Sequence, residues 1–375
     1  MSTTVQRRQG FETSLAQDKI VTGIYESGEA MPKILVHDRH GNISWSWNAT
    51  MGTSHVPIKV RKCIQGGRSA TEVKWAGNGD RIAAIIGRSA VIVGYSGQFD
   101  KTVLFAVCLA GLSANSHTVE LLPGMLLAVA TSGQTRNDGI YIYDANKMER
   151  DPRPIQTLVG VRAIHGMIWD QQGQKLWAAG TTDAADGSGG VAYSVVQGYA
   201  YNGESRPRLR ESDTFTMPEA KHLSAEWKGR FSKWWDGAHD LVPVPDERVL
   251  LVPTELDIHA LHLDNGSFSQ GEQVAGQYLK RFLPLGERIG YDGEELPRSD
   301  IKSVSLHMDG SALYTQAPWR DPSGLTKQSN LLDSPSHDYS ALLQGETMYR
   351  SRWFMNTPGW PSPDISEPKL FSGKC

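Results

Sequence analysis

Hydrophobic residues recur at fixed intervals along the chain, and one interval pattern appears five times. The five copies begin at Thr71, His117, His165, His239 and Lys302, and we call this place position zero. Two places later each copy has an apolar residue, and four places later only Pro243 interrupts the alternation. In four copies a second apolar run opens eleven places after position zero, at Ile82, Leu176, Leu250 and Leu313. Alternation followed by a turn is typical of paired β-strands, so each copy predicts a strand pair.

One copy shows the complete repeat, with expected strands at 72–75, 81–86, 90–95 and 102–107. Successive copies start 117 − 71 = 46 and 165 − 117 = 48 residues apart. A four-stranded propeller blade occupies about 40 to 50 residues. The sequence therefore predicts an all-β fold, a β-propeller of six or seven four-stranded blades. A β-sandwich and a parallel β-helix are the alternatives, but neither explains a four-strand period with turns inside each repeat.

The next two intervals are longer than one blade, at 239 − 165 = 74 and 302 − 239 = 63 residues. We interpret them as insertions near 203–236 and 281–299 in a single propeller domain that spans 19–355. Residues 1–18 are predicted to form an N-terminal arm, and 356–375 an irregular C-terminal tail. Because the chain starts partway through a blade, we expect a strand near 347–354 to close the ring.

Composition narrows the class of partner. The formal net charge is −3 and charged residues make up 21% of the chain, so no basic field favours nucleic acid. No apolar run approaches the roughly 18 residues that a membrane-spanning helix needs. We therefore expect a monomer that binds a small molecule or an oligosaccharide, with neither nucleic acid nor a membrane as partner.

The cysteines and the start of the chain bear on its compartment. Cys63, Cys108 and Cys375 show no metal-ligand spacing and too few pairs for a disulfide framework, so we expect Cys63 and Cys108 to be small buried hydrophobic residues. The first residues lack the apolar run of a secretory signal. As written, the sequence predicts a cytoplasmic protein. A secreted protein whose signal had been replaced by a cloned methionine would begin in the same way.

Position zero carries the residues that are best suited to catalysis or ligand binding. The inner strand of each propeller blade lines a central channel, so the first residues of these strands meet at one face. This arrangement would gather His117, His165 and His239 with Lys302. A single histidine at a strand entrance commonly packs and hydrogen-bonds a carbonyl, but three at one repeat position favour a polar site. Imidazoles act as acid and base near neutral pH, and they also bind divalent metals.

We predict His117, His165 and His239 as catalytic residues and no required cofactor, with a divalent metal among the imidazoles as the open alternative. The loops between second and third strands lie on the same face and add cationic and aromatic side chains. Arginine can clamp a carboxylate and tryptophan can stack on a sugar ring, although loop arginines are commonly just solvated. The predicted substrate-binding residues are Lys302, Arg88, Arg136, Arg162, Trp319 and Arg320.

Other loop residues on this face are Asp183, Glu255 and Asp257. The segment 222–236 mixes tryptophans with basic residues, among them Trp227, Arg230 and Trp234. Because the rest of the chain is not basic, we interpret this segment as a lid or packed cap over the channel rather than as a surface for single-stranded nucleic acid.

The motifs at 117–123, 165–170 and 239–243 resemble a family of microbial propellers of mostly unassigned function. They are also similar to the propeller polysaccharide lyases of fungi and bacteria that cleave rhamnose from glucuronate in gum-arabic-type side chains. The resemblance covers roughly residues 20 to 355. It implies a channel-facing histidine, here His117, His165 or His239. It also implies basic residues that neutralise the uronate carboxylate, here Arg136, Lys302 and Arg320. Those lyases are generally secreted, and the absence of a signal departs from their pattern.

The leading functional hypothesis is a β-elimination lyase that acts on a glucuronate-containing saccharide, with histidine as acid and base and Arg or Lys neutralising the carboxylate. One alternative is an intracellular cyclase or isomerase of a small metabolite in the same funnel. Another is a non-catalytic propeller that serves as an interaction scaffold, since a fold alone does not determine a function.

Overall fold

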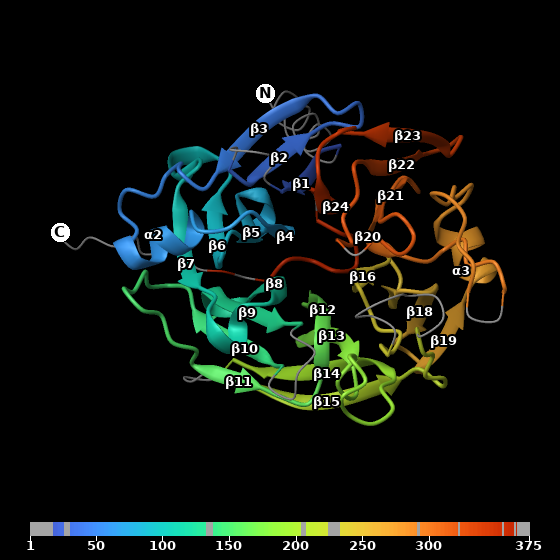
Figure 1. Cartoon of the computed structure of the whole chain (residues 1–375). Helices are drawn as coiled ribbons and strands as arrows, with labels where there is room; N and C mark the ends of the chain where they lie inside the picture. The colour runs from blue at the N-terminus through green and yellow to red at the C-terminus, as the bar shows by residue number, and fades with distance from the viewer. Residues whose placement is uncertain are drawn as a thin grey trace, which may run out of the picture.

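The computed structural model describes residues 18–25, 31–132, 138–203, 208–223, 233–290, 293–321, 323–354, 356–363 and 365. In this part of the chain the strands form six sheets of four antiparallel strands each, arranged as blades around a central axis (Figure 1). The predicted β-propeller is confirmed, and the number of blades is six.

Five blades are each built from four consecutive strands. Blade two contains β4 (Ala70–Ala76), β5 (Arg81–Ile86), β6 (Ser89–Gly94) and β7 (Val103–Cys108). Blade three contains β8 (Ser116–Leu122), β9 (Leu126–Thr131), β10 (Ile140–Asp144) and β11 (Gln156–Leu158). Blade four contains β12 (Arg162–Asp170), β13 (Lys175–Thr181), β14 (Ser194–Asn202) and β15 (Arg208–Thr216). Blade five contains β16 (Val242–Pro243), β17 (Val249–Pro253), β18 (Ile258–His262) and β19 (Ser267–Gln270). Blade six contains β20 (Ile301–Leu306), β21 (Ala312–Gln316), β22 (Ser329–Asp333) and β23 (Asp338–Leu342).

Blade one joins the two ends of the chain. Its inner strand is β24 (Met348–Trp353), followed outward by β1 (Ile20–Ile24), β2 (Lys33–His37) and β3 (Ile43–Asn48). β24 pairs antiparallel with β1, and Ile20 lies opposite Trp353. The predicted closure of the ring by a C-terminal strand near 347–354 is therefore confirmed.

Among the residues that the structure describes, two short α-helices lie outside the blades, α2 (Ile58–Ile64) before blade two and α3 (Glu272–Tyr278) after blade five. No helix in the described ranges is long and apolar enough to cross a membrane. The interval 203–236 is not wholly an insertion as predicted, because it contains β15, the outer strand of blade four. The sequence hid this strand because most of its residues are exposed and polar, with Leu209 and Phe215 as its only large hydrophobic side chains.

The hydrophobic core consists of separate clusters that lie between neighbouring blades. Val21 and Val73 belong to the cluster that joins blades one and two, and Trp177 and Leu250 to the one that joins blades four and five. Each inner strand therefore has apolar residues on both faces, which explains why the residue two places after position zero is buried in every copy.

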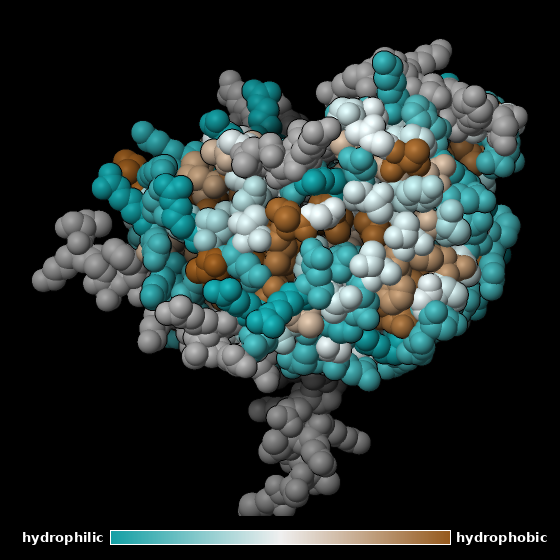
Figure 2. All heavy atoms as spheres, turned by 90° about the horizontal axis from the view of Figure 1, so that it is seen from below, coloured by the Kyte–Doolittle hydropathy of each residue, from teal (hydrophilic) through white to brown (hydrophobic). Residues whose placement is uncertain are grey.

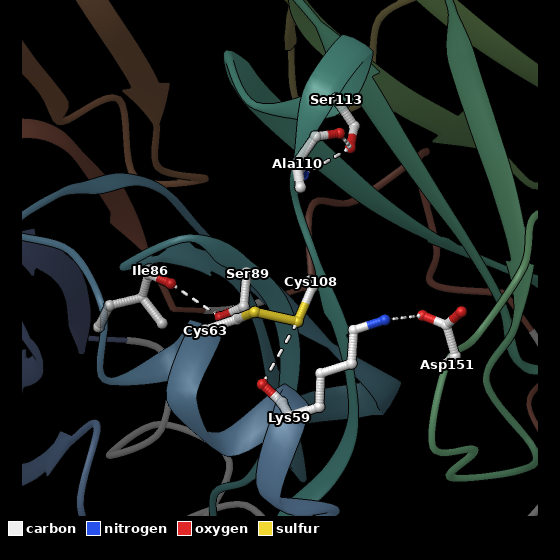
Figure 3. The surroundings of a disulfide bond; sticks show 8 residues. All are labelled: Lys59, Cys63, Ile86, Ser89, Cys108, Ala110, Ser113 and Asp151. Carbon is white, nitrogen blue, oxygen red and sulfur yellow. Dashed lines mark hydrogen bonds and ion pairs between the residues drawn. A yellow bond between two sulfur atoms is a disulfide. The ribbon is translucent and has the colours of Figure 1, made fainter.

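The expectation for the cysteines is wrong, because Cys63 and Cys108 form a disulfide (Figure 3). The two residues are 45 positions apart in the sequence, but α2 packs against β7 and brings their Cα atoms to 5.4 Å. Lys59 in α2 also pairs with Asp151, at 2.6 Å between Nζ and Oδ1, next to the disulfide. Both cysteines are half-buried rather than core residues. Sequence spacing carries no sign of this pair, since it depends on how a helix docks on an outer strand.

The C-terminal tail crosses the end of the channel where the inner strands finish, and Figure 1 shows its red trace running across the blades. Its residues Thr357, Trp360 and Pro361 cover a cavity of about 100 Å³ that Lys74 and Arg352 also line. Trp360 anchors the tail on blade five, where Nε1 donates to the carbonyl oxygens of Val244 and Glu247 at 3.0 Å each. We call this end of the channel the tail end, and the opposite end the histidine end.

The side of the molecule in Figure 2 is covered mainly by hydrophilic side chains, with hydrophobic ones in small clusters between them. The exposed large hydrophobic residues come from many different segments, including Ile43, Ile155 and Leu283. Scattered residues of this kind are normal for a globular surface and do not by themselves indicate an interaction face.

Candidate functional site

Several inner strands bulge at position zero, and the bulge turns this side chain toward the channel. In β4 both Ala70 and Glu72 are paired with adjacent residues of β5, so Thr71 is an extra residue. The pairing of β8 skips His117 in the same way, and that of β20 skips Lys302. A β-bulge re-aims a side chain without ending the strand, and bulges are common beside active sites. In these three strands the position found by the sequence repeat is therefore the position of a bulge, whereas His239 precedes β16.

A sixth position-zero residue, Tyr349, was missed by the sequence reasoning. It lies in β24, where the register shifts between the partners of Thr22 and Ile24. Its distance from the preceding copy, 349 − 302 = 47 residues, matches one blade, and Trp353 follows four places later as an aromatic residue does in two other copies. The signal was obscured because Ser351, two places after Tyr349, is polar. We call the six position-zero side chains the upper tier: Thr71, His117, His165, His239, Lys302 and Tyr349.

The structure brings the three histidines together at the histidine end. The ring centroids of His117 and His165 are 4.9 Å apart, and those of His165 and His239 are 5.0 Å apart, in edge-to-face arrangements. The Tyr349 ring lies 5.7 Å from that of His117. Lys302 Nζ is 2.9 Å from His239 Nε2. Four of the predicted residues therefore form one cluster with Tyr349.

All three imidazoles are held neutral at ordinary pH. Burial, followed by the positive charge of Arg350, lowers the pKa of His117 to about 3. Burial and the neighbouring histidines lower the pKa of His165 well below its usual value. Burial and the Lys302 ammonium lower the pKa of His239. Neutral imidazoles keep a lone pair on one nitrogen, so at pH 7 each can accept a proton, although the lowered pKa makes it a weaker base than a free imidazole.

His165 has a fixed tautomer. Its Nδ1 lies 2.8 Å from the carbonyl oxygen of Ala163, which can only accept, so Nδ1 carries the proton and Nε2 carries the lone pair. Ala163 adopts φ 45°, an unusual backbone conformation for a residue with a Cβ, and its N–H donates to Asp138 at 2.8 Å. Within the described chain no other residue hydrogen-bonds Nε2 of His165. A strained backbone that orients a basic nitrogen is a feature of functional sites.

His239 lies between an ammonium and a carboxylate. Its Nε2 is 2.9 Å from Lys302 Nζ and 3.2 Å from Glu255 Oε1, and its Nδ1 is 3.4 Å from the Tyr349 hydroxyl. With the proton on Nδ1 the ring accepts from Lys302, and with the proton on Nε2 it donates to Glu255. Each neutral tautomer satisfies one of the two partners of Nε2. Because the other ring nitrogen, Nδ1, faces Tyr349, His239 can accept a proton on one nitrogen and release one from the other.

Lys302 and Tyr349 keep their protons. Burial lowers the pKa of Lys302, but Asp300 at 3.1 Å, with Tyr349 and Glu255, outweighs it and raises the pKa above the usual value. Burial raises the pKa of Tyr349, which keeps the phenol protonated. The cluster therefore contains neutral bases, one cation and one weak acid, and Lys302 is only 3% exposed.

A network of ion pairs fills the channel directly below the upper tier. The Arg350 guanidinium is fully buried and donates to the main-chain oxygens of His117, His165 and His239, at 3.1, 2.5 and 2.7 Å. It also pairs with Glu72 at 2.5 Å. Arg352 binds both Glu72 and Asp240, and Lys74 binds Glu120. We call this set the lower tier: Glu72, Lys74, Glu120, Asp240, Arg350 and Arg352.

The structure shows contacts with groups other than the histidines for three of the other predicted residues, and a fourth lies outside the described chain. Arg88 is exposed in the β5–β6 turn beside Gly66, and the Arg162 guanidinium donates to the Asp138 carbonyl at 3.3 Å. The guanidinium of Arg320 lies 5.6 Å from the ring of Trp319. Arg136 lies outside the described residues.

Trp319 and part of the predicted lid form a small apolar cluster near the site. Trp319 and Trp234 pack against Leu223, Leu256 and Leu296, and Leu256 directly follows Glu255. Trp227 and Arg230 of the predicted lid lie outside the described residues. The aromatic residues thus contact the loop that carries Glu255.

Within the described residues no group of three or more His, Cys, Asp or Glu side chains could hold a metal ion. Beyond Tyr349, the sequence reasoning missed Arg350 and Asp236. Asp236 is buried and forms a hydrogen bond with Glu255. Neither residue stands at a repeated position with a recognisable motif, so only the three-dimensional arrangement identifies them.

No protein-family model and no curated protein sequence matches the chain. Its fold is similar to that of a hypothetical selenium-binding protein from Sulfolobus tokodaii, with a TM-score of 0.51, 8% identity, and coverage of 93% of this chain and 96% of that one. A periplasmic gluconolactonase from Pseudomonas aeruginosa aligns with a TM-score of 0.45 and 13% identity over 90% of this chain and 80% of its own. At such identities the likeness concerns the fold alone.

Proposed function

We propose that the protein is a β-elimination lyase that acts on a glucuronate-containing saccharide at the histidine end of the channel. The observation that carries the proposal is the upper tier itself, in which neutral imidazoles adjoin a Lys302 ammonium. A base and a cation are what elimination beside a carboxylate requires, because the cation neutralises the carboxylate and makes the adjacent C–H more acidic.

In the proposed reaction His165 Nε2 takes the proton from C5 of the uronate. The electron pair of that bond forms the C4–C5 double bond, and the C4–O bond breaks. The leaving oxygen takes a proton from the Tyr349 hydroxyl. The sequence reasoning gave this acid role to a second histidine, but imidazoles with lowered pKa values carry no extra proton at neutral pH. Afterwards His165 loses its proton to solvent, and Tyr349 regains one through His239, whose Nδ1 is 3.4 Å away.

The disulfide supports a substrate outside the cytoplasm. Disulfides persist in oxidising compartments and are rare in the cytosol, so Cys63–Cys108 favours the secreted alternative left open by the sequence. Plant-gum polysaccharides are extracellular substrates. The compartment and the proposed saccharide are therefore consistent with each other.

The test is to mix the purified chain with gum arabic and glucuronate-capped oligosaccharides, and to follow the ultraviolet absorbance of an unsaturated uronate. We expect a rise for the wild type, and a loss of about 10²-fold or more in rate for His165→Gln. His262→Gln is the matched control, because His262 is a half-buried histidine of β18 that bonds Ser269 away from the channel. A flat trace for the wild type on all substrates would contradict the proposal.

A second candidate is an isomerase or cyclase of a small metabolite that uses the same proton chemistry. The observation that favours it is how little of the cluster is exposed, with His165 and His239 each at 7%. The same absorbance assay separates the two candidates, because an isomerase produces no unsaturated uronate. If His165→Gln weakens the binding of a small acid but not of a saccharide, the second candidate is supported.

A further inference from the structure

A cavity of about 170 Å³ lies between blades four and five, apart from the central channel. Its walls include Ser194 from β14, His259 from β18 and Gln270 from β19, with Lys221 and Asp236 from the segment between β15 and β16. A polar cavity of this size has room for several water molecules. Nothing in the proposed reaction uses it so far.

His259 faces this cavity as a buried base. It is 7% exposed, and burial lowers its pKa to about 4, so the imidazole is neutral at ordinary pH. Within the described chain its ring has no hydrogen-bond partner. Buried polar groups are normally paired with protein or with water, so the His259 nitrogens indicate a hydrated cavity. The charged neighbours are Lys221, which opposes protonation of His259, and Asp257, which favours it. Glu219, also on the cavity wall, is exposed.

Asp236 belongs both to this cavity and to the central cluster. It lines the cavity, and its side chain hydrogen-bonds Glu255. Glu255 in turn has Oε1 3.2 Å from His239 Nε2, while its Oε2 accepts the Gly237 N–H at 2.6 Å. Asp236, Glu255 and His239 are each less than one-tenth exposed. A continuous line of exchangeable groups thus connects the cavity with the upper tier.

The two carboxyl groups differ in protonation. Burial and the adjacent Glu255 raise the pKa of Asp236 well above its usual value, so Asp236 is a neutral acid. Burial opposes ionisation of Glu255, but His239 and the Lys302 ammonium outweigh it and lower the pKa. Two adjacent carboxyl groups that share one proton are suited to passing it on, since either can hold it.

We propose that Asp236 and Glu255 form a proton route between the cavity and His239. In one passage Asp236 gives its proton to the ionised Glu255, and Glu255 passes a proton on to His239 Nε2. Asp236 then regains a proton from cavity water or from protonated His259, and that donor takes one from solvent. One proton has moved inward, and both carboxyl groups are back in their starting protonation states. This inference rests on the proposed function for its purpose, because the route would resupply the proton that Tyr349 gives to the leaving group through His239.

The test measures the resting protein, so it does not depend on knowing the substrate. The rate at which the His239 ring N–H exchanges with water is measured by NMR on the full chain at pH 7, with the signal identified by its loss in His239→Gln. We expect Asp236→Asn to slow the exchange on the order of a hundredfold, because the amide keeps the hydrogen bonds but does not release a proton to Glu255. Asp213→Asn, in β15 and paired with Lys175, is the matched control and should change nothing.

An unchanged rate in Asp236→Asn would overturn the route. If that variant does not fold, Glu255→Gln serves instead, because every passage of the route goes through the Glu255 carboxylate, and an unchanged rate there would equally overturn the route. Slowed exchange in a protein that shows no elimination activity would reject the lyase and leave the route intact. Elimination activity with an unchanged exchange rate would reject the proton route and leave the lyase proposal intact.

Discussion

The two tiers of the channel come from the same inner strands, one to three residues apart, yet they have opposite electrostatic characters. In the upper tier three histidines are neutral and touch mainly by ring edges, with centroids 4.9 and 5.0 Å apart. In the lower tier three acidic and three basic side chains form ion pairs as short as 2.5 Å. The lower tier also holds the upper one, because Arg350 binds the main-chain oxygens of all three histidines. The comparison teaches that the arginine–carboxylate ion pairs of the channel lie beneath the candidate site, whereas the site itself combines neutral imidazoles with the Lys302–Asp300 pair.

The largest effect is expected from Arg350→Met. Removing this guanidinium takes one ion-pair partner from Glu72 and leaves three carbonyl oxygens without their donor. Breaking a buried ion pair typically costs about 3–5 kcal/mol. The free energy of unfolding, measured in urea, should fall by this amount. Arg281→Met is the control, because Arg281 and Asp338 form an exposed pair whose loss should cost less than about 1 kcal/mol. Equal small losses for both variants would show that the lower tier does not support the upper one.

The next effect is expected from removing the disulfide, which lies far from either tier in the blade. A disulfide that closes a loop of 45 residues stabilises by about 2–4 kcal/mol, chiefly through the unfolded chain. The Cys63→Ser, Cys108→Ser double variant should lose this amount in urea, while the titration of His117 stays unchanged. A shifted histidine titration would mean that the upper tier depends on the outer strands and not on Arg350 alone.

A smaller effect is expected in the pH dependence of the unfolding free energy, to which the neutral His117 of the upper tier contributes. The pKa of His117 is about 3 in the folded protein and about 6.5 in an unfolded chain. The unfolded state binds more protons between these values, so stability falls as the pH drops from about 6.5 towards 3. His117→Gln should reduce the slope of unfolding free energy against pH by about 1.4 kcal/mol per unit near pH 5. An unchanged slope would show that His117 titrates normally.

The fold was accessible from the sequence because blade packing imposes a strict spacing. Val73 and Met167 are buried between blades at the same repeat position, and the same apolar pattern recurs in each of the five copies although the intervals between copies differ. The gathering of the histidines followed from the same repeat. The bulges that aim them did not, because a bulge depends on pairing with the next strand and leaves no residue signature here.

The network around the histidines could not be predicted, since it depends on contacts between distant segments. Arg350 and Glu72 are 278 residues apart in the sequence, and neither stands out by its neighbours. Tyr349 was obscured by a single polar residue at the expected apolar place. The cysteine pair was misjudged because helix docking, not spacing, brings Cys63 to Cys108.

The central claim is that the upper tier holds neutral imidazoles, with a basic Nε2 on His165. The most direct measurement is ¹⁵N NMR of the histidine side chains from pH 7 to pH 4, with signals assigned by single His→Gln variants. The account predicts that His117, with a pKa of about 3, remains neutral down to pH 5, that His165 and His239 have pKa values below the usual value for histidine, and that His165 carries its proton on Nδ1. Titration of these three near pH 6.5, or a proton on Nε2 of His165, would contradict it.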